Sequence, residues 1–192
     1  MRKIVVAEFV TLDGVMQDPG GAGEFARGGW SRAYWDDDIA AIKSEEMRAA
    51  DALLLGRVTY EGFAANWPAM PDAPGADFMN GQPKYVVSTT LTNPTWNNSH
   101  IIRENVMAEM AALKQQDGRD ILVNGSSQLV QTLMLAHLID EYRLLVYPVV
   151  VGAGKRLFNS SADAKLKLIE ARPLTSGVAF LRYEPENQEP AQ

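Results

Sequence analysis

The chain has no cysteine and only two histidines, which lie far apart in the sequence at positions 100 and 137. The missing thiols exclude disulfides, thiolate catalysis and cysteine-based zinc sites, and two distant histidines disfavour a histidine-rich metal site. The composition still permits a metal site made of carboxylates, although we expect no metal site. No apolar run approaches the roughly 20 residues of a membrane-spanning helix, and the first apolar run already contains Glu8, so no signal peptide is indicated. We therefore expect a cytoplasmic protein.

An excess of positive charge is also missing. The chain has 18 Lys and Arg against 24 Asp and Glu, which gives a net charge of −6. A nucleic-acid module needs a basic surface, so this balance disfavours one. With 192 residues, of which 46% are hydrophobic, the chain is long enough for one domain with a full core. We expect a single domain at 1–184 that binds a small molecule, a polar tail at 185–192, and neither nucleic acid nor a membrane as a partner.

Strand and helix patterns alternate along the first 140 residues. In residues 3–10, apolar side chains stand at odd and even positions alike, which is typical of a strand covered on both faces. Acidic residues at 36–38 precede an amphipathic helix pattern, where they suit the helix dipole. Further strands are predicted at 52–56, 84–89, 101–102, 120–125, 142–152, 165–174 and 177–185, and further helices at 57–66, 105–116 and 126–139. This order predicts an α/β fold with a mixed, mostly parallel sheet, helices on both faces and a C-terminal antiparallel hairpin.

Two strand-to-helix junctions are rich in small and hydroxylic residues, at Gly56-Arg57-Val58-Thr59 and at Asn124-Gly125-Ser126-Ser127. Phosphate groups bind at such helix N-termini, beyond the carboxyl ends of strands. Glycine lets a ligand approach the backbone closely, and arginine pairs with phosphate. Either junction alone is more often a turn and a helix cap. Together with a third strand that ends in Ser88-Thr89-Thr90, they favour an extended ligand such as a dinucleotide, without the ordinary GxGxxG motif.

Five segments carry a resemblance to a known family. They read TLDG (11–14), LLLGRVTYEGF (53–63), KYVVSTT (84–90), ILVNGSSQLVQTLM (121–134) and LIDEYRLLVYPVVVGAGKRLF (138–158). In this order and at these spacings the chain resembles the dihydrofolate-reductase-like superfamily. Within it, the chain is similar to the C-terminal reductase domain of the bifunctional riboflavin-biosynthesis deaminase-reductase. The resemblance implies a three-layer fold, a reductase that uses NADPH, and a homodimer.

The resemblance also implies which residues contact NADPH. They are Gly56, Arg57 and Thr59 for the phosphates, Ser88 and Thr89 for the 2′-phosphate, Gly125, Ser126, Ser127 and Gln128 for the pyrophosphate, and the end of the first strand, Val10 to Asp13, for the nicotinamide. Asn124 and Leu129, which flank the pyrophosphate residues, are expected to contact the cofactor as well. The second junction departs from the family pattern, which often has a run of glycines where this chain has two serines.

Hydride transfer needs a proton source or a charge stabiliser besides orientation. Asp13 is the first choice as the catalytic residue, because LDG ends the strand beside the expected nicotinamide, although Asp-Gly is also a common turn. The residues expected to contact the substrate are Glu8, Trp30, Tyr34 and Tyr147.

The substrate implied by the resemblance is the ribosylamino-pyrimidine that is reduced in riboflavin synthesis. Dihydrofolate is the alternative, but the chain lacks the Trp-x-x-Pro segment of dihydrofolate reductases, and its acids at 36–38 suit a helix cap. A third hypothesis, from another class, is an NADPH-binding module without turnover.

Overall fold

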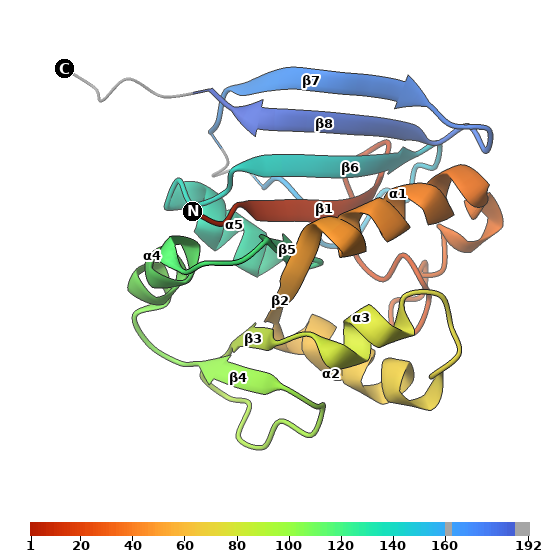
Figure 1. The fold of residues 1–192 in the computed structure, drawn as a ribbon. Helices are drawn as coiled ribbons and strands as arrows, with labels where there is room; N and C mark the ends of the chain where they lie inside the picture. The colour runs from red at the N-terminus through yellow and green to blue at the C-terminus, as the bar shows by residue number, and fades with distance from the viewer. Residues whose placement is uncertain (160–162, 187–192) are drawn as a thin grey trace.

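The computed structural model describes residues 1–159 and 163–186 (Figure 1). One sheet contains eight strands in the order β4-β3-β2-β5-β1-β6-β8-β7. The strands are β1 (Ile4–Thr11), β2 (Ala50–Gly56), β3 (Lys84–Val87), β4 (Ser99–Ile102), β5 (Asp120–Val123), β6 (Glu141–Tyr147), β7 (Leu166–Pro173) and β8 (Ala179–Pro185). Strands β1 to β6 run parallel to one another, whereas β8 pairs antiparallel with β6 and β7. The predicted parallel sheet and antiparallel hairpin are confirmed.

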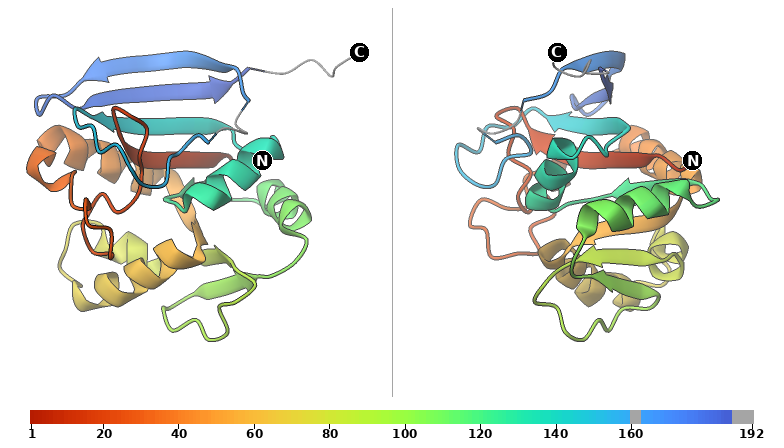
Figure 2. Two further views of the ribbon diagram at one scale, coloured as in Figure 1. Left: turned by 180° about the vertical axis from the view of Figure 1, so that it is seen from behind. Right: turned by 90° about the vertical axis from the view of Figure 1, so that its left-hand side faces the viewer.

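Helices cover both faces of the sheet, which gives three layers (Figures 1 and 2). They are α1 (Asp37–Ala49), α2 (Arg57–Asn66), α3 (Ala76–Gly81), α4 (Val106–Gln115) and α5 (Ser127–Leu135), with short 3-10 turns η1 (Arg32–Tyr34) and η2 (Trp67–Ala69). Apolar residues of α4 and α5 pack against alternate residues of β1, β2 and β5, such as Val6 and Leu54. The opposite residues of these strands, such as Val5 and Leu53, pack on the side of α2 and α3. Each fully buried side chain of this kind contributes about 1.5–3 kcal/mol to folding.

Two predicted elements end four or five residues before the predicted position. The strand predicted to Gly152 ends at Tyr147, because Pro148 has no N–H for a sheet hydrogen bond and the amide of Val149 turns back to the carbonyl of Tyr147 at 2.7 Å. The helix predicted to residue 139 ends at Leu135, and His137 then adopts a positive φ of 52°.

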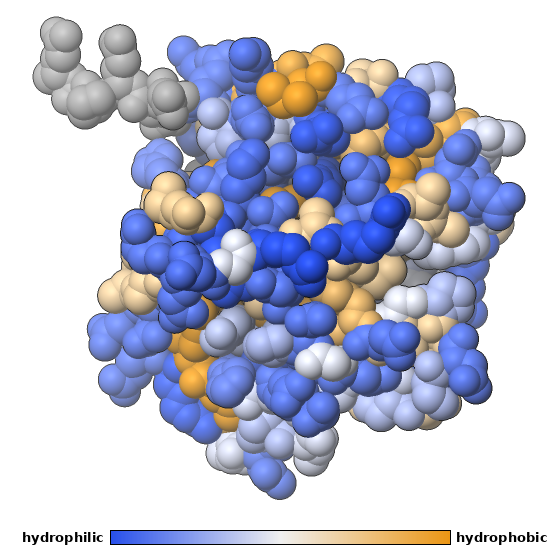
Figure 3. Space-filling model, in the orientation of Figure 1, coloured by the Kyte–Doolittle hydropathy of each residue, from blue (hydrophilic) through white to orange (hydrophobic). Residues whose placement is uncertain are grey.

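The surface in Figure 3 is predominantly hydrophilic, with hydrophobic residues in separate patches. Among the described residues, no helix combines the length and the apolar content needed to cross a bilayer. The predicted tail beyond Glu186 lies outside the described residues.

Candidate functional site

The two small-residue junctions contact each other at the carboxyl ends of β2 and β5. The amide of Gly56 donates to the carbonyl of Gly125 at 3.2 Å. A β-carbon on Gly56 would overlap Ser126 Oγ, and one on Gly125, whose φ is +92°, would lie 2.8 Å from Thr59 Oγ1. Packing within the chain therefore requires glycine at both positions, because a side chain at either one would prevent the two junctions from lying against each other. The peptide between Gly125 and Ser126 is cis.

Both helices that start at these junctions lack a side-chain cap. Gly56 precedes α2 and Ser126 precedes α5, and neither side chain accepts a hydrogen bond from the helix that follows. The first amides of a helix have no partner within the helix, and the helix dipole makes this end positive. Two such ends in contact form a site suited to an anion with two phosphate groups.

Arg57 and Thr59 lie in the first turn of α2. The guanidinium of Arg57 donates to Glu61 at 2.8 and 3.1 Å, and its side chain is 43% exposed. An exposed pair of this kind contributes only about 0.3–0.5 kcal/mol, so Arg57 can exchange Glu61 for a phosphate. At the start of α5, Ser127 is buried and Gln128 is exposed.

The two large apolar residues among the predicted cofactor contacts have buried side chains. Val10 and Leu129 are 5% and 4% exposed and belong to the core under α5. Their side chains pack against the protein, so the backbone is the part of these residues that can face a ligand.

Ser88 follows β3 and shapes the loop after it. Its Oγ accepts hydrogen bonds from the amides of Thr90 at 3.1 Å and Leu91 at 2.9 Å, and it lies 3.5 Å from Thr90 Oγ1, where either hydroxyl can donate. Arg103, which sequence reasoning missed, follows the neighbouring strand β4 and donates to the carbonyls of Leu91 at 2.7 Å and Thr89 at 3.4 Å. This exposed cation thus lies beside the Ser88 loop. Its position directly after Ile101-Ile102 was a usable signal, because parallel strands end at one edge.

Glu8 is buried on β1, where β5 turns away. The pairing of β1 with β5 ends at Val6 and Val123, and Asn124 then donates from Nδ2 to the carbonyl of Ala7 at 2.8 Å. Burial raises the pKa of Glu8 to about 8, while the charge of Lys43 and the backbone N–H of Gly125 oppose the rise. Among the described residues, Oε1 of Glu8 has no hydrogen-bond partner.

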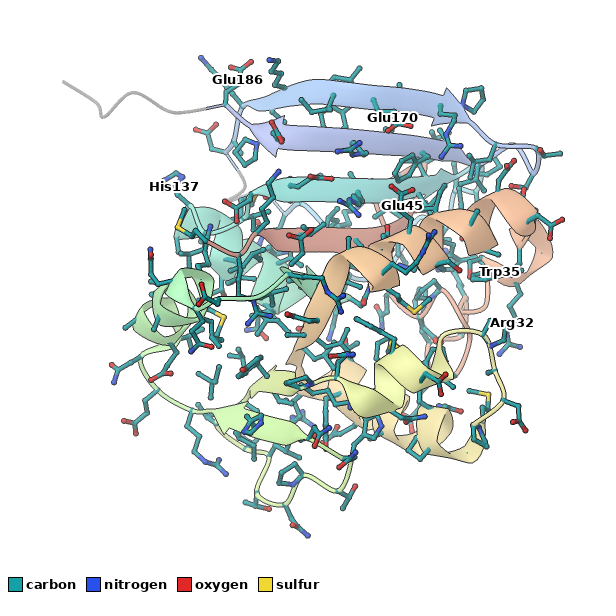
Figure 4. All side chains as sticks on the ribbon, in the orientation of Figure 1. Arg32, Trp35, Glu45, His137, Glu170 and Glu186 are labelled. Carbon is teal, nitrogen blue, oxygen red and sulfur yellow. The ribbon has the colours of Figure 1, made fainter. Side chains whose placement is uncertain are left out.

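Three predicted substrate residues do converge, in an aromatic cluster at the end of β6. The ring of Tyr147 lies 5.3 Å from that of Trp30, 5.8 Å from Tyr34 and 5.4 Å from Phe9, measured between centroids. Sequence reasoning missed Phe9, because an apolar residue within an apolar strand indicates only core. Trp35 (labelled in Figure 4) has its ring centroid 6.4 Å from that of Phe9 and is 56% exposed, so it extends the cluster to the surface.

The hydroxyl of Tyr147 is buried in this cluster. Burial and the charge of Asp36 raise its pKa, so the phenol stays protonated. The hydroxyl oxygen has no hydrogen-bond partner among the described residues. A buried hydroxyl without a partner inside an aromatic cluster suits a planar ligand that carries a polar group.

Asp13 links two loops that follow β1 and β6. Its carboxylate accepts from the Thr11 hydroxyl at 2.6 Å and from the amides of Gly152 at 2.8 Å and Val151 at 3.1 Å. Chiefly the Thr11 hydrogen bond, and then these amides, lower the pKa of Asp13 to about 2. The carboxylate is therefore ionised at neutral pH and has no proton to give. The contacts account for Asp13 as a structural link, and its predicted catalytic role stays a prediction.

A cavity of about 580 Å³ lies elsewhere, at the amino end of β1. His137, which belongs to its lining, and Trp35 lie at opposite ends of the molecule in Figure 4. Three of the charged groups at this cavity are in ion pairs: Lys3 lies 3.6 Å from Glu184, and Asp140 lies 2.6 Å from Lys114. We therefore locate the candidate site at the carboxyl ends of the strands.

Comparison with known sequences gives relatives along the whole chain. A family model of the RibD C-terminal domain matches residues 2–180. The uncharacterized protein YyaP of Bacillus subtilis (strain 168) is 29% identical over 188 residues, which cover 95% of this chain and 94% of YyaP. The uncharacterized protein YwjB of the same organism is 30% identical over 170 residues, which cover 87% of this chain and 89% of YwjB.

Comparison with solved structures shows the dihydrofolate-reductase-like fold. A putative riboflavin biosynthesis protein from Shewanella sp. PV-4 matches with a TM-score of 0.74 and 20% identity over 97% of this chain and 100% of its own. Dihydrofolate reductase from Enterococcus faecalis, complexed with NADP(H), matches with a TM-score of 0.65 and 12% identity, over 96% of this chain and 97% of its own. A deaminase/5-amino-6-(5-phosphoribosylamino)uracil reductase from Thermotoga maritima matches with a TM-score of 0.64 and 15% identity. The match covers 96% of this chain and 56% of the Thermotoga chain.

Proposed function

The chain belongs to the RibD C-terminal domain family, and we propose on this basis that it is a reductase that transfers hydride from NADPH to a small heterocyclic substrate. Bound NADPH supplies the hydride from its dihydronicotinamide ring. The residues of the chain bind and orient the two reactants.

The order of the site groups along the sheet carries the proposal. The loops after β4 and β3 present Arg103 and Ser88, a cation and a hydroxyl. The next two strands, β2 and β5, end in the paired helix N-termini, and β1 and β6 follow with Glu8 and the aromatic cluster. An extended NADPH molecule requires the same sequence of partners: one for a 2′-phosphate, one for a pyrophosphate, and a less polar place for a nicotinamide beside its substrate.

The residues at the junctions fit the pyrophosphate of NADPH even though serines occupy positions where the family often has glycine. A phosphate binds to backbone N–H groups, and serine keeps its N–H. Ser126 points its Oγ toward Gly56, into the place of the β-carbon that Gly56 lacks, so this side chain fills the gap between the two junctions.

For the substrate, the aromatic cluster favours a planar ring. Trp30 and Tyr34 approach Tyr147 edge-on, at interplanar angles of 75° and 81°, and Trp30 is held by a 3.0 Å hydrogen bond from Nε1 to the carbonyl of Gln17. The pyrimidine of 5-amino-6-(5-phosphoribosylamino)uracil is such a ring, and the Thermotoga relative in fold acts as its reductase by name. We propose this compound, or a close analogue, as the substrate.

Dihydrofolate is the weaker candidate. The acids near the first helix, which a folate enzyme would direct at the pterin, already have partners here. Asp36 accepts from the amides of Ile39 at 2.8 Å and Ser176 at 2.9 Å, and Asp38 accepts from the Thr175 hydroxyl at 2.8 Å. They connect the start of α1 to the turn between β7 and β8.

The test is NADPH binding and oxidation with a panel of substrates. We expect saturable NADPH binding, and oxidation that depends on the phosphoribosylamino-pyrimidine more than on dihydrofolate. Binding without oxidation of NADPH by either compound would favour the module without turnover. A folded protein that does not bind NADPH would refute the proposal. The cytoplasmic location and the homodimer stay predictions, and size-exclusion chromatography with light scattering would check the latter.

A further inference from the structure

Glu8 differs from the other buried carboxyl groups among the described residues. Glu46 and Glu141 are each 2% exposed, against 8% for Glu8, and both pair with cations. In the described residues Oε2 of Glu46 also lacks a hydrogen bond, but it has the ion pair with Lys43. Glu46 meets Lys43 at 2.5 Å, and Glu141 meets Arg143 at 2.6 Å. Glu8 forms no ion pair in the described part of the chain, and its Oε1 has no hydrogen-bond partner there. A buried polar atom without a hydrogen-bond partner destabilises the folded chain. This points to a ligand that supplies the missing hydrogen bond.

The position of Glu8 along the sheet says which part of a ligand it meets. The proposed 2′-phosphate partners follow β3 and β4, and the pyrophosphate partners follow β2 and β5. Strand β1 is the next in order, so the cofactor proposed above reaches β1 with its nicotinamide end. Asn124, which precedes Gly125, donates from Nδ2 to the carbonyl of Ala7 at 2.8 Å, and this contact holds the strand next to Glu8 against the pyrophosphate turn.

We propose that the neutral carboxyl group of Glu8 pairs with the carboxamide of the nicotinamide ring and thereby orients that ring. A neutral carboxylic acid offers one O–H donor and one carbonyl acceptor, and a carboxamide offers the complementary N–H and C=O. A carboxylate has no donor, so the pairing requires the protonated form. This inference rests on the proposed use of NADPH, and it assigns Glu8 to the cofactor in place of the substrate contact predicted from the sequence.

The surroundings of Glu8 keep it protonated at neutral pH. The charged groups that act on it are Lys43 and Glu46 of α1, which pair with each other. Burial outweighs the opposing charge of Lys43, and the charge of Glu46 adds to the rise, so the pKa of Glu8 is about 8. On the neighbouring strand β6 its register partner is Leu144, which carries no charge.

The test compares NADPH with 2′-phospho-ADP-ribose, which has both phosphate sites but no nicotinamide. Both are titrated into the wild type, Glu8→Gln and Glu8→Leu. Glutamine keeps one donor and one acceptor, so Glu8→Gln should bind NADPH nearly as the wild type does at pH 7. Leucine keeps neither, and Glu8→Leu should bind NADPH about tenfold more weakly or worse, which is the loss expected for one or two hydrogen bonds. All three proteins should bind 2′-phospho-ADP-ribose equally.

The pH dependence gives a second, independent readout. The affinity of the wild type for NADPH should fall as the pH rises through about 8, whereas Glu8→Gln should show no such fall. If Glu8→Leu does not fold, these two pH profiles decide the matter alone. Identical profiles for the wild type and Glu8→Gln would overturn the inference.

Two other outcomes separate the inference from the proposed function. Equal weakening of both ligands in Glu8→Leu would mean that Glu8 acts on the pyrophosphate turn, which overturns the nicotinamide pairing but leaves NADPH as the cofactor. Failure of the folded wild type to bind either ligand would refute both. An analogue of NADPH with an acetyl group in place of the carboxamide lacks the amide N–H, so it should bind the wild type more weakly than NADPH does.

Discussion

The amide of Gly56 donates a 3.2 Å hydrogen bond to the carbonyl of Gly125, and this contact joins the amino ends of α2 and α5. The two glycines lie 69 positions apart in the sequence, yet each is needed because a side chain of the other junction occupies the place of its β-carbon. Everything proposed for the cofactor depends on this contact, since it brings two sets of free helix amides together.

Substitution of Gly125 by alanine tests the contact. The new β-carbon would lie 2.8 Å from Thr59 Oγ1 at a φ of +92°, so we expect the free energy of unfolding to fall by about 1–3 kcal/mol and NADPH to bind more weakly. Gly62→Ala in α2 is the matched control. No atom lies within 4 Å of the place that its new β-carbon would take, and alanine favours helix, so stability should rise by up to about 1 kcal/mol. Equal effects of the two substitutions in urea unfolding would contradict the account.

Arg103 should distinguish NADPH from NADH. Its guanidinium lies at the Ser88 loop, so Arg103→Ala should weaken NADPH binding about tenfold, the magnitude expected for a hydrogen bond to a charged group, and leave NADH unchanged. Arg57→Ala, at the pyrophosphate, should instead weaken both nucleotides. Fluorescence titration with each nucleotide measures this. A loss for NADH as large as that for NADPH would refute the 2′-phosphate assignment of Arg103.

The hydroxyl of Tyr147 should matter for the substrate and not for folding. Because it has no hydrogen-bond partner among the described residues, Tyr147→Phe should keep or slightly raise the thermal stability and should raise KM for the pyrimidine. Tyr60→Phe is the control, since the Tyr60 hydroxyl accepts from the Trp96 amide at 3.0 Å. Its loss should reduce stability by about 1–3 kcal/mol. A stability loss in Tyr147→Phe of similar size would show that its hydroxyl has a structural partner.

Glu8 should make stability depend on pH in an unusual direction. Its pKa is raised from 4.5 to about 8 in the folded chain. Between these values the unfolded chain releases this proton and the folded chain keeps it, so the free energy of unfolding should fall as the pH rises. Glu8→Gln should not show this fall in the free energy of unfolding with rising pH, whereas Glu45→Gln, at an exposed position on α1, should show it. Chemical unfolding across this pH range measures the difference, and parallel curves for the wild type and Glu8→Gln would contradict the raised pKa.

The sequence predicted the architecture well because that information is local. Period-two and helical patterns gave the order of elements, and the acidic residues at 36–38 do cap α1 through Asp36. The end of β6 was missed, since the apolar run continues to Val151 while Pro148 stops the pairing.

The site was predicted less completely, because its contacts join distant residues. Trp30, Tyr34 and Tyr147 were named singly, and only the fold brings their rings together. Arg103 was missed because its position after the predicted strand at 101–102 becomes informative only when that strand is paired with β3. The contacts of Asp13 with Val151 and Gly152 could not be predicted either, because these residues lie more than 130 positions away in the sequence.

The central claim is that the strand ends hold NADPH along its length, and isothermal titration of the folded wild type with NADPH tests it most directly. The account predicts one saturable site per chain, weakened by Gly125→Ala and by Arg57→Ala and unaffected by Gly62→Ala. Absence of heat from binding at any NADPH concentration, with the protein shown to be folded, would contradict it.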